Sequence, residues 1–534
     1  MEKSRADQAV DVQRWVQAVW VALALLLIAR LVTMAWIPLM DTTEARYGEI
    51  GRKMVTLGDW ITPWHEMGVP FWGKPVLSFW LTAASFKLLG IHEFAARLPH
   101  LMCSLGAMLC VWNVVRRHGP AVATIAAALM GGSLLFFLGG AAVMTDEAMV
   151  LGITMATCST WLAMASDDEA QRHRHRWLAF VGAAIGVMAK GPLTLVLIGT
   201  PLFLWALWCG RWRALWQALP WIRGLLLMAA LTVPWFWLAE RKTPGFIEYF
   251  IVGEHFHRFV TPGWSGDLYG NAHHHVKGTI WAYAAGALAP WTLLVPLLWI
   301  WQRWKGSPQR PAEVPALSSE PASVPWRLTL REERRLALLW GLVPLVFFTA
   351  SSNIIWTYVL PAIPGLAWWV AGWMGRAPQQ GLRWSLAGVV LSTVLLGVGV
   401  VVAKNVGRYD RGSAQGLIAA CQAQQNRPSL GTVSGTVANP NARPGAGTAA
   451  QPQDPQEPIV VILGRRSFSA DYYSAGRALR VDDLSPMAAQ WPAAGRCVAL
   501  YEEDRAAIER AGLQVSQDLG VHHERLVMWV VPAR

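Results

Sequence analysis

The sequence is poor in charge and in cysteine for its length. Only 15% of its 534 residues are Asp, Glu, Lys or Arg, whereas about 25% is usual for a soluble domain. Hydrophobic residues make up 54% of the chain, which excludes disorder for most of it. Six cysteines are too few for a disulfide-rich scaffold, and 47 glycines are too few for collagen. These shortages leave a membrane protein as the class that fits the composition.

Tryptophan and positive charge are present in excess. The 32 tryptophans suit bilayer interfaces, where this side chain collects. Lys and Arg number 46 against 34 Asp and Glu, which gives a net charge of +12. In a soluble protein this balance could indicate nucleic acid. In so apolar a chain it indicates loops that face anionic lipid, so we expect membrane lipids and no nucleic acid as partners.

Apolar runs long enough to cross a bilayer recur through residues 1–403. Some runs are short, so we expect an α-helical polytopic protein with about 11–13 transmembrane helices. We predict eleven crossings, at 15–37, 99–115, 120–140, 147–165, 177–190, 192–209, 221–239, 279–302, 336–350, 354–374 and 384–403.

Arginine-rich loops alternate along this region. The positive-inside rule puts those loops and the N-terminus in the cytoplasm. An odd number of crossings then leaves the C-terminal segment outside, in the periplasm of a bacterium whose inner membrane holds the protein. The outer loops are 38–98, 141–146 and 240–278, and 76–90 should lie as an interfacial helix in the first. The inner arginines are Arg116, Arg117, Arg172, Arg174, Arg176, Arg211, Arg213, Arg223, Arg376, Arg383 and those of 303–335.

The tail at 404–534 has a different composition. Residues 422–457 are rich in Gly, Pro, Ala, Gln and Asn and should form a disordered insert. Short apolar runs with helical patterns between them follow, which predicts a small periplasmic α/β domain. Cys421 and Cys497 would face an oxidising compartment, and a disulfide between them is a hypothesis beside that of two free thiols.

Acidic residues stand at three membrane edges. Asp41 and Glu44 follow the first crossing, and Asp146 lies where the third leaves the membrane and the fourth begins. Ionisable groups beside spanning segments are costly, so they indicate function. The alternative for Asp146 is an N-cap of the fourth crossing, a role that Thr145 could also fill.

Basic residues should converge on the same face. They are Arg46, Lys74, Lys190 and Arg258. A lysine at the end of a span can simply snorkel, which is the alternative for Lys190. Several cations beside carboxylates favour a site for an anionic headgroup, and phosphate suits both lysine and arginine.

Motifs that contain these residues resemble those of the GT-C membrane glycosyltransferases. The branch that they resemble comprises the lipid A aminoarabinose transferases and the protein O-mannosyltransferase-like enzymes. The likeness covers roughly 15–375. It rests on 41–50 (DTTEARYGEI), 58–60 (GDW), 73–75 (GKP), 93–99 (EFAARLP), 145–146 (TD), 189–192 (AKGP), 254–259 (EHFHRF) and 358–362 (YVLPA), in this order.

The resemblance implies a bundle of spans with interfacial helices in the first outer loop. It implies transfer of a sugar, with inversion, from a polyprenyl-phosphate donor at the outer face of the inner membrane. The favoured sugar is 4-amino-4-deoxy-L-arabinose and the favoured acceptor lipid A. Three positions depart from the family pattern: Thr43 stands where an Asp is usual, Gly73 where Glu is common, and Val76 where Pro is common.

Roles follow from the chemistry. A phosphate leaving group needs no general acid, but it needs cations, and the acceptor oxygen needs a base or an orienting carboxylate. Asp41 or Glu44 would supply the carboxylate, with Asp146 assisting, and Tyr47, Tyr358, Glu254 and His255 would line the groove. No cofactor is required. The donor phosphate would be held by Arg46, Lys74, Lys190 and Arg258.

Other hypotheses stay open. Histidines of the second large outer loop, His255, His257 and His273, could bind Zn²⁺, although their spacing matches no closed structural motif. A protein O-glycosyltransferase would use another acceptor. A transporter would use Asp146 and Lys190 as an intramembrane ion pair, yet no inverted repeat is evident. We expect a monomer.

Overall fold

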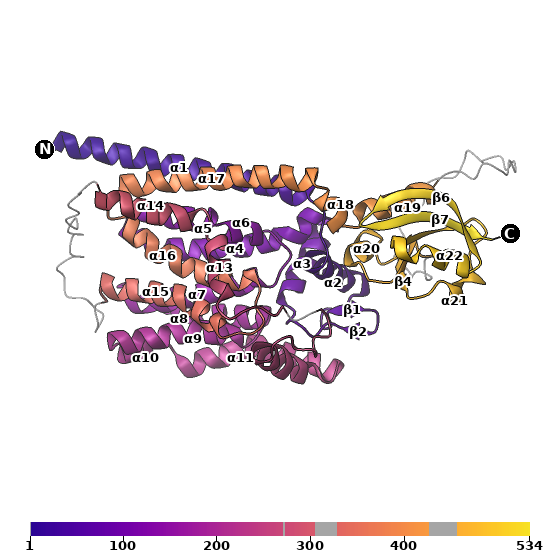
Figure 1. Ribbon diagram of the computed structural model, residues 1–534. Helices are drawn as coiled ribbons and strands as arrows, with labels where there is room; N and C mark the ends of the chain where they lie inside the picture. Colours follow the sequence, from indigo (N-terminus) through magenta and orange to yellow (C-terminus); the bar gives the residue numbers. More distant parts are fainter. Residues whose placement is uncertain (1, 271–272, 305–327, 427–456, 534) are drawn as a thin grey trace, which may run out of the picture. The chain divides into compact units, whose positions relative to one another are not determined.

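A computed structural model describes residues 2–270, 273–304, 328–426 and 457–533 (Figure 1). The chain divides into two compact units. The first comprises residues 1–37 and 50–401, and the second comprises 38–49 and 402–534. The expected boundary near residue 403 thus lies close to the observed one. The segment 38–49, expected in the membrane domain, groups instead with the tail.

The first unit is a bundle of helices. Within the described residues, five helices are long and apolar enough to cross a membrane: α1 (Glu2–Trp36), α4 (Glu93–Val115), α7 (Asp146–Ala165), α11 (Trp221–Lys242) and α17 (Pro378–Asn405). Helices α13 (Thr279–Ala287) and α14 (Trp291–Trp304) would make a sixth as one span bent by 79°. The chain is thus confirmed as an α-helical polytopic membrane protein.

The other predicted crossings also coincide with helices. These are shorter or carry charged residues, so length and composition alone do not qualify them, and eleven crossings remain a prediction. They are α5 (Pro120–Gly131) with α6 (Leu134–Gly139), α8 (Glu169–Lys190), α9 (Leu193–Cys209), α15 (Leu330–Thr349), and η3 (Trp356–Ala362) with α16 (Ile363–Met374). Short helices η1 (Arg116–His118) and α10 (Trp212–Ala218) lie between them.

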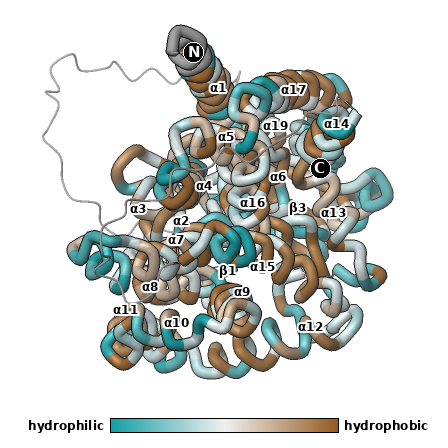
Figure 2. Tube along the Cα trace, turned by 90° about the vertical axis from the view of Figure 1, so that its left-hand side faces the viewer, coloured by the Kyte–Doolittle hydropathy of each residue, from teal (hydrophilic) through white to brown (hydrophobic). Residues whose placement is uncertain are grey.

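Small residues allow α7 and α8 to pack tightly. A Cβ atom added to Gly152 of α7 would lie 2.5 Å from the backbone nitrogen of Gly186 in α8. Such close contact of backbones is common between membrane helices. Other helices turn apolar residues outward, as α17 does with Val394, Val398 and Val401, which suits contact with lipid. Figure 2 shows hydrophobic residues along the helices of this unit.

The outer loops are structured. The first contains α2 (Thr43–Leu57), a short hairpin of β1 (Trp64–Glu66) and β2 (Val69–Pro70), and α3 (Leu77–Leu89). Helix α3 coincides with the interfacial stretch predicted at 76–90. The second large loop contains the π-helix η2 (Glu248–His257) and α12 (Arg258–Val260).

The second unit contains the predicted α/β domain. Its sheet has the order β4-β3-β5-β7-β6, with β3 parallel to β4 and β5, and β7 antiparallel to β5 and β6. The strands are β3 (Val460–Leu463), β4 (Ala478–Val481), β5 (Arg496–Leu500), β6 (Leu513–His522) and β7 (Arg525–Pro532). The helices are α18 (Arg408–Gly412), α19 (Gln415–Gln425), α20 (Phe468–Tyr473), α21 (Ser485–Ala488), η4 (Glu502–Asp504) and α22 (Ala506–Arg510).

Cys421 of α19 and Cys497 of β5 form a disulfide, with their Cα atoms 5.6 Å apart. Both cysteines are buried. Residues 422–425, expected in the insert, instead complete α19 because its helical pattern continues through them. Residues 427–456 of the predicted insert lie outside the described residues.

Candidate functional site

One pocket in the first unit brings together residues that are far apart in the sequence. Three of the four cations predicted to bind phosphate line it, together with three of the predicted groove residues. Aromatic side chains form part of its wall. The lining residues are Lys74, Lys190, Leu193, Glu254, His255, Arg258, Phe259, Phe347, Phe348, Ser351, Asn353 and Tyr358.

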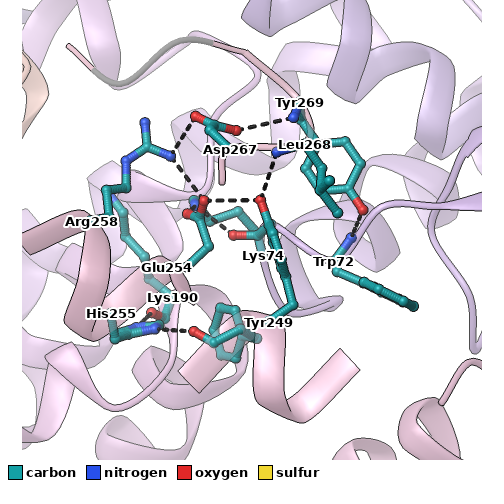
Figure 3. A network of polar contacts seen from close by, with 12 residues as sticks. Trp72, Lys74, Lys190, Tyr249, Glu254, His255, Arg258, Asp267, Leu268 and Tyr269 are labelled. Carbon is teal, nitrogen blue, oxygen red and sulfur yellow. Dashed lines mark hydrogen bonds and ion pairs between the residues drawn. The ribbon is translucent and has the colours of Figure 1, made fainter. Parts of the chain in front are cut away.

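A chain of ion pairs crosses the pocket (Figure 3). The ammonium of Lys74 lies 2.8 Å from Oε2 of Glu254. Nη1 of Arg258 lies 2.9 Å from Oε1 of the same carboxylate and 3.0 Å from Oδ2 of Asp267. The Glu254 side chain is only 4% exposed, so it is a buried anion between two cations.

These charges fix the ionisation of the site. Burial alone would raise the pKa of Glu254, but the charges of Lys74 and Arg258 and their hydrogen bonds lower it to about 2. Burial opposes the charge of Arg258, yet the carboxylates of Glu254 and Asp267 raise the pKa of the guanidinium. Glu254 and Arg258 are therefore both charged at neutral pH.

Arg258 retains donors for a ligand. Its Nη1 makes both ion pairs, while Nε and Nη2 make no hydrogen bond to any described residue. A guanidinium presents its N–H groups as a planar fork, which matches the oxygens of a phosphate. The pocket can thus receive an anion without breaking the pair of Arg258 with Glu254.

Backbone contacts hold the second outer loop against the bundle. The Nδ2 of Asn353 donates to the carbonyl oxygens of Arg258 at 2.6 Å and of Thr261 at 2.8 Å. Its Oδ1 accepts from the backbone N–H of Gly263 at 3.2 Å. Asn353 uses both ends of its amide and fixes the backbone that carries Arg258.

Tyrosines join this loop to the first outer loop. The hydroxyl of Tyr269 donates to the Pro70 carbonyl at 2.8 Å and accepts from the Trp72 N–H at 3.0 Å. Tyr249 donates to Glu254 at 3.4 Å. Burial raises the pKa of Tyr269 to about 12, and burial also raises that of Tyr249. Both phenols stay protonated and act as donors at neutral pH.

Lys190 and Asp146 form a second, deeper pair. The ammonium lies 2.5 Å from Oδ1 of Asp146, and the two side chains are 8% and 9% exposed. Lys190 also lies 5.0 Å from the ring centroid of Tyr358. The N-cap of α7 is Thr145, and Asp146 is the first helical residue with its carboxylate on Lys190. The N-cap and snorkelling alternatives are therefore wrong, and Asp146 holds Lys190 rather than lining the pocket.

The close packing around Lys190 requires a glycine at position 191. Gly191 ends α8 with a φ of 80°, a conformation that favours glycine. A Cβ atom there would meet the Phe250 ring at 2.5 Å and the His255 ring at 3.0 Å. The AKGP motif thus lets η2 pack closely against the end of α8.

The histidines do not form the metal site considered from the sequence. Within the parts of the chain that the structure describes, no group of three His, Cys, Asp or Glu side chains could hold a metal ion. The ring nitrogens of His255 lie 2.7 Å from the Phe250 carbonyl and 3.1 Å from that of Lys190. Burial lowers the pKa of His255. The fold gives the ring of His255 to backbone carbonyls, so the described residues offer no support for the Zn²⁺ hypothesis at His255, His257 and His273.

The first-loop candidates belong to the second unit. Asp41 accepts hydrogen bonds from the hydroxyls of Ser467 at 2.8 Å and Ser469 at 2.9 Å, and from the Ser469 N–H at 2.8 Å. His523 lies 3.2 Å from it. Both oxygens of Asp41 are occupied by the tail, which gives this carboxylate a structural role.

Helix α2 carries the other three first-loop candidates. Glu44 lies in the first turn of the helix and is half-buried. Arg46 lies against the rings of Tyr47, at 5.3 Å, and Phe468, at 5.6 Å. Tyr47 is buried. Arg46 thus contacts the tail through Phe468.

Sequence reasoning missed several residues of the pocket. The sequence indicates no role for Asn353 or the three phenylalanines of the lining, nor for Asp267, which pairs with Arg258. The signal for Asn353 was the polar run Ser351, Ser352 and Asn353 between two predicted crossings. Asp267 gave no comparable signal, because its pairing with Arg258 depends on how the loop folds.

Comparison with known proteins gives matches to one group of transferases. Residues 73–237 match the family described as dolichyl-phosphate-mannose-protein mannosyltransferase. The undecaprenyl phosphate-alpha-4-amino-4-deoxy-L-arabinose arabinosyl transferase of Erwinia tasmaniensis is 29% identical over 62% of this chain and 54% of its own length. That of Edwardsiella ictaluri is 26% identical over 68% of this chain and 60% of its own length. The chain thus spans little more than half the length of these relatives.

The fold matches a solved structure over nearly the whole chain. The crystal structure of ArnT from Cupriavidus metallidurans bound to undecaprenyl phosphate has a TM-score of 0.71 and 17% identity. The match covers 96% of this chain and 97% of that one. At this identity the likeness shows the fold. The chain therefore has the GT-C fold, and the resemblance to the aminoarabinose transferases that its motifs indicate is confirmed.

Proposed function

We propose that the chain is a glycosyltransferase that uses a polyprenyl-phosphate sugar and transfers 4-amino-4-deoxy-L-arabinose to lipid A. The observation that carries the proposal is the pocket where Lys74, Lys190 and Arg258 meet aromatic side chains at the ends of apolar helices. Cations suit the phosphate of the donor, and Phe259, Phe347 and Phe348 suit the adjoining lipid chain.

Sugar transfer depends on cations that stabilise the leaving phosphate more than on a proton donor. The acceptor oxygen attacks the anomeric carbon from the side opposite the phosphate, which inverts the configuration. The bond from carbon to phosphate oxygen breaks, and polyprenyl phosphate leaves with the electron pair. Negative charge grows on that phosphate, and fixed cations stabilise it most when water is excluded. Lys74, Lys190 and Arg258 would supply this stabilisation.

The acceptor needs an orienting or deprotonating carboxylate. We propose Glu44 for this role, because the oxygens of Asp41 are already bonded to Ser467 and Ser469. Asp146 would contribute by holding Lys190 in place. Arg46 would help to bind the donor phosphate and Tyr47 would line the groove for the lipid phosphate.

The setting of the reaction follows from the topology. We propose that the chain is a monomer in the bacterial inner membrane, with the N-terminus in the cytoplasm and the tail in the periplasm. The arginine distribution supports this orientation. The described residues supply cations from their own side chains, so we expect no cofactor to be required.

Mass spectrometry of lipid A tests the proposal. Cells with the chain should carry lipid A heavier by one aminopentose residue than cells without it, and the Lys74→Ala variant should not restore that mass. Unchanged lipid A would overturn the favoured acceptor.

The same cells can test two alternatives. The match of residues 73–237 to protein mannosyltransferases favours a protein acceptor as the second candidate. Sugar on periplasmic proteins, present only with the active chain, would support that candidate. Movement of the donor lipid across the membrane without transfer would support a transporter.

A further inference from the structure

A second cavity lies at the end of the helix pair α7 and α8 that is remote from the reaction pocket. It has a volume of about 400 Å³ and is lined by Asn113, Arg116, Arg117, Leu162, Gln171, Arg174 and His175. A volume of several hundred Å³ is enough for a small ligand or a headgroup. Its lining residues come from α4, η1, α7 and α8.

The cavity and the reaction pocket lie toward opposite ends of α7 and α8. Asp146 begins α7 and Ala165 ends it, so this helix of 20 residues is ~30 Å long. The pair of Asp146 with Lys190 lies at one end of the two helices. Leu162 and His175 lie at the other. If the reaction pocket faces the periplasm, this cavity faces the cytoplasm.

The lining has positive charge without a carboxylate. Three arginines line the cavity, and no Asp or Glu among the described residues does so. Carboxylates on the neighbouring helices pair with other cations: Glu169 pairs with Arg172 and Arg176, and Glu333 lies 2.7 Å from His118. Asp167 and Glu333 act on Arg117 from outside the lining. Arg117 also donates to the Ala165 carbonyl at 3.5 Å.

Two of the arginines retain their hydrogen-bond donors. Arg116 lies 5.2 Å from the ring of Trp112, and no described residue accepts a hydrogen bond from its guanidinium. Arg174 likewise makes no ion pair or hydrogen bond to a described residue. Two planar forks therefore face one cavity, and their mutual repulsion would be relieved by an anion.

The buried side chain of His175 is affected by the charges of the same arginines. His175 lies just before the predicted crossing 177–190, with Nδ1 3.5 Å from the hydroxyl of Ser159. Burial lowers its pKa to about 4, and the charges of Arg174 and Arg117 add to the effect. At neutral pH the imidazole is uncharged and can donate or accept a hydrogen bond beside the arginines.

We propose that this cavity binds a phosphate group, supplied by the headgroup of an anionic lipid in the cytoplasmic leaflet. Basic pockets between helices on that side of a membrane suit such headgroups. The forks of Arg116 and Arg174 would bind the phosphate oxygens, and the amides of Asn113 and Gln171 would donate to the rest. The positive-inside rule explains arginines in both loops, after α4 and after α7, but not their convergence on one cavity. The site is independent of the proposed transfer activity.

Native mass spectrometry of the full chain tests the site. Delipidated protein would be titrated with phosphatidylglycerol, cardiolipin or phosphatidylcholine. We expect one anionic lipid to remain bound to the wild type, and the variant Arg116→Gln with Arg174→Gln to bind it about tenfold more weakly. The variant Arg116→Lys with Arg174→Lys keeps the charge but loses the forks, and should lie between the two.

The control removes the same charge from the same side of the bundle. Arg213→Gln with Arg223→Gln alters two exposed arginines that do not line the cavity, and should bind anionic lipid like the wild type. If the Arg116→Gln, Arg174→Gln variant does not fold, the single variants Arg174→Gln and Arg174→Lys can be compared for binding of anionic lipid in the same way.

Inorganic phosphate separates the two sources of the anion. If phosphate alone raises the melting temperature of the wild type but not of the Arg116→Gln, Arg174→Gln variant, the cavity binds free phosphate. If only the lipids bind, the headgroup is the ligand. Equal binding of anionic lipid and phosphate by the wild type and that variant would overturn the site, as would equal retention of phosphatidylcholine and phosphatidylglycerol.

Discussion

Glu254 is the residue on which the reaction pocket depends. Its carboxylate contacts both Lys74 and Arg258. Without it, two cations would face one another in a buried site. Its role is therefore to hold them close enough to bind one phosphate, rather than to transfer a proton.

The pH dependence of folding should show this role. The pKa of Glu254 is lowered from 4.5 to about 2, so its stabilising effect is complete above pH 4.5 and is lost as pH falls from 4.5 toward 2. The stabilities of the wild type and of Glu254→Gln, followed from pH 8 down to pH 2, should converge at the acid end. At pH 7 we expect the variant to be less stable by about 3 kcal/mol. A constant difference at all pH values would contradict this assignment.

Lys74 should be required for transfer and not for folding. It lies in the turn before α3, and its ammonium reaches the pocket. Removal of one donor from an anion-stabilising site typically costs about 10²–10³ in rate, so Lys74→Ala should lose at least that much activity. Lys87→Ala is the matched control, because Lys87 is exposed in the last turn of the same helix. Activity of Lys74→Ala equal to that of the control would remove Lys74 from the mechanism.

Asp146 and Lys190 should behave as a coupled pair. Removal of one partner leaves a buried charge, so Asp146→Asn and Lys190→Met should each destabilise by about 3–5 kcal/mol. The double variant should lose less than the sum of the two. Thermal unfolding in detergent would measure the cycle, and additive losses would show that the pair is not coupled.

For single residues, the sequence predicts which side chains belong to the site better than it predicts what those side chains contact. The chemistry of Lys74, Lys190, Arg258 and Tyr358 marked them as site residues, and the pocket contains all four. Asp41 was a reasonable choice by charge and position. Its bonds to Ser467 and Ser469 join residues more than 400 positions apart, and spacing in a sequence carries no information about such contacts.

At the scale of the element, the apolar runs were the strong signal. All eleven predicted crossings coincide with helices or pairs of helices. The breaks inside them were not predicted, such as the bend between α13 and α14. Hydropathy averages over a window of residues, so it does not register a short irregular turn within an apolar run.

The disulfide between Cys421 and Cys497 should stabilise the fold of the tail. Cys421 and Cys497 are 76 residues apart, so their bond restricts a long loop in the unfolded chain. Loops of this size correspond to about 4 kcal/mol. The double variant Cys421→Ser with Cys497→Ser should therefore unfold at lower denaturant concentration in the tail, as followed by hydrogen exchange of β5 and β7. Cys110→Ser, outside this unit, is the control.

At the scale of the whole molecule, the orientation of the chain can be tested directly. Eleven crossings with a cytoplasmic N-terminus place the C-terminus outside. Alkaline phosphatase fused after residue 533 should be active, and the same reporter fused after Gly210, between α9 and α10, should be inactive. The reverse pattern would place the pocket and the basic cavity on exchanged sides.

The helix pair α7 and α8 has a consequence for the membrane around it. On α8, Lys190 of the buried ion pair and Arg174 of the basic cavity are ~24 Å apart along the helix. This length is somewhat less than the roughly 30 Å hydrocarbon thickness of a bilayer. Charged groups at both ends oppose further tilting, so the protein would meet a thicker or thinner bilayer by deforming the lipid. Bilayer thickness is therefore a variable that sets how far the lipid around this helix pair must deform.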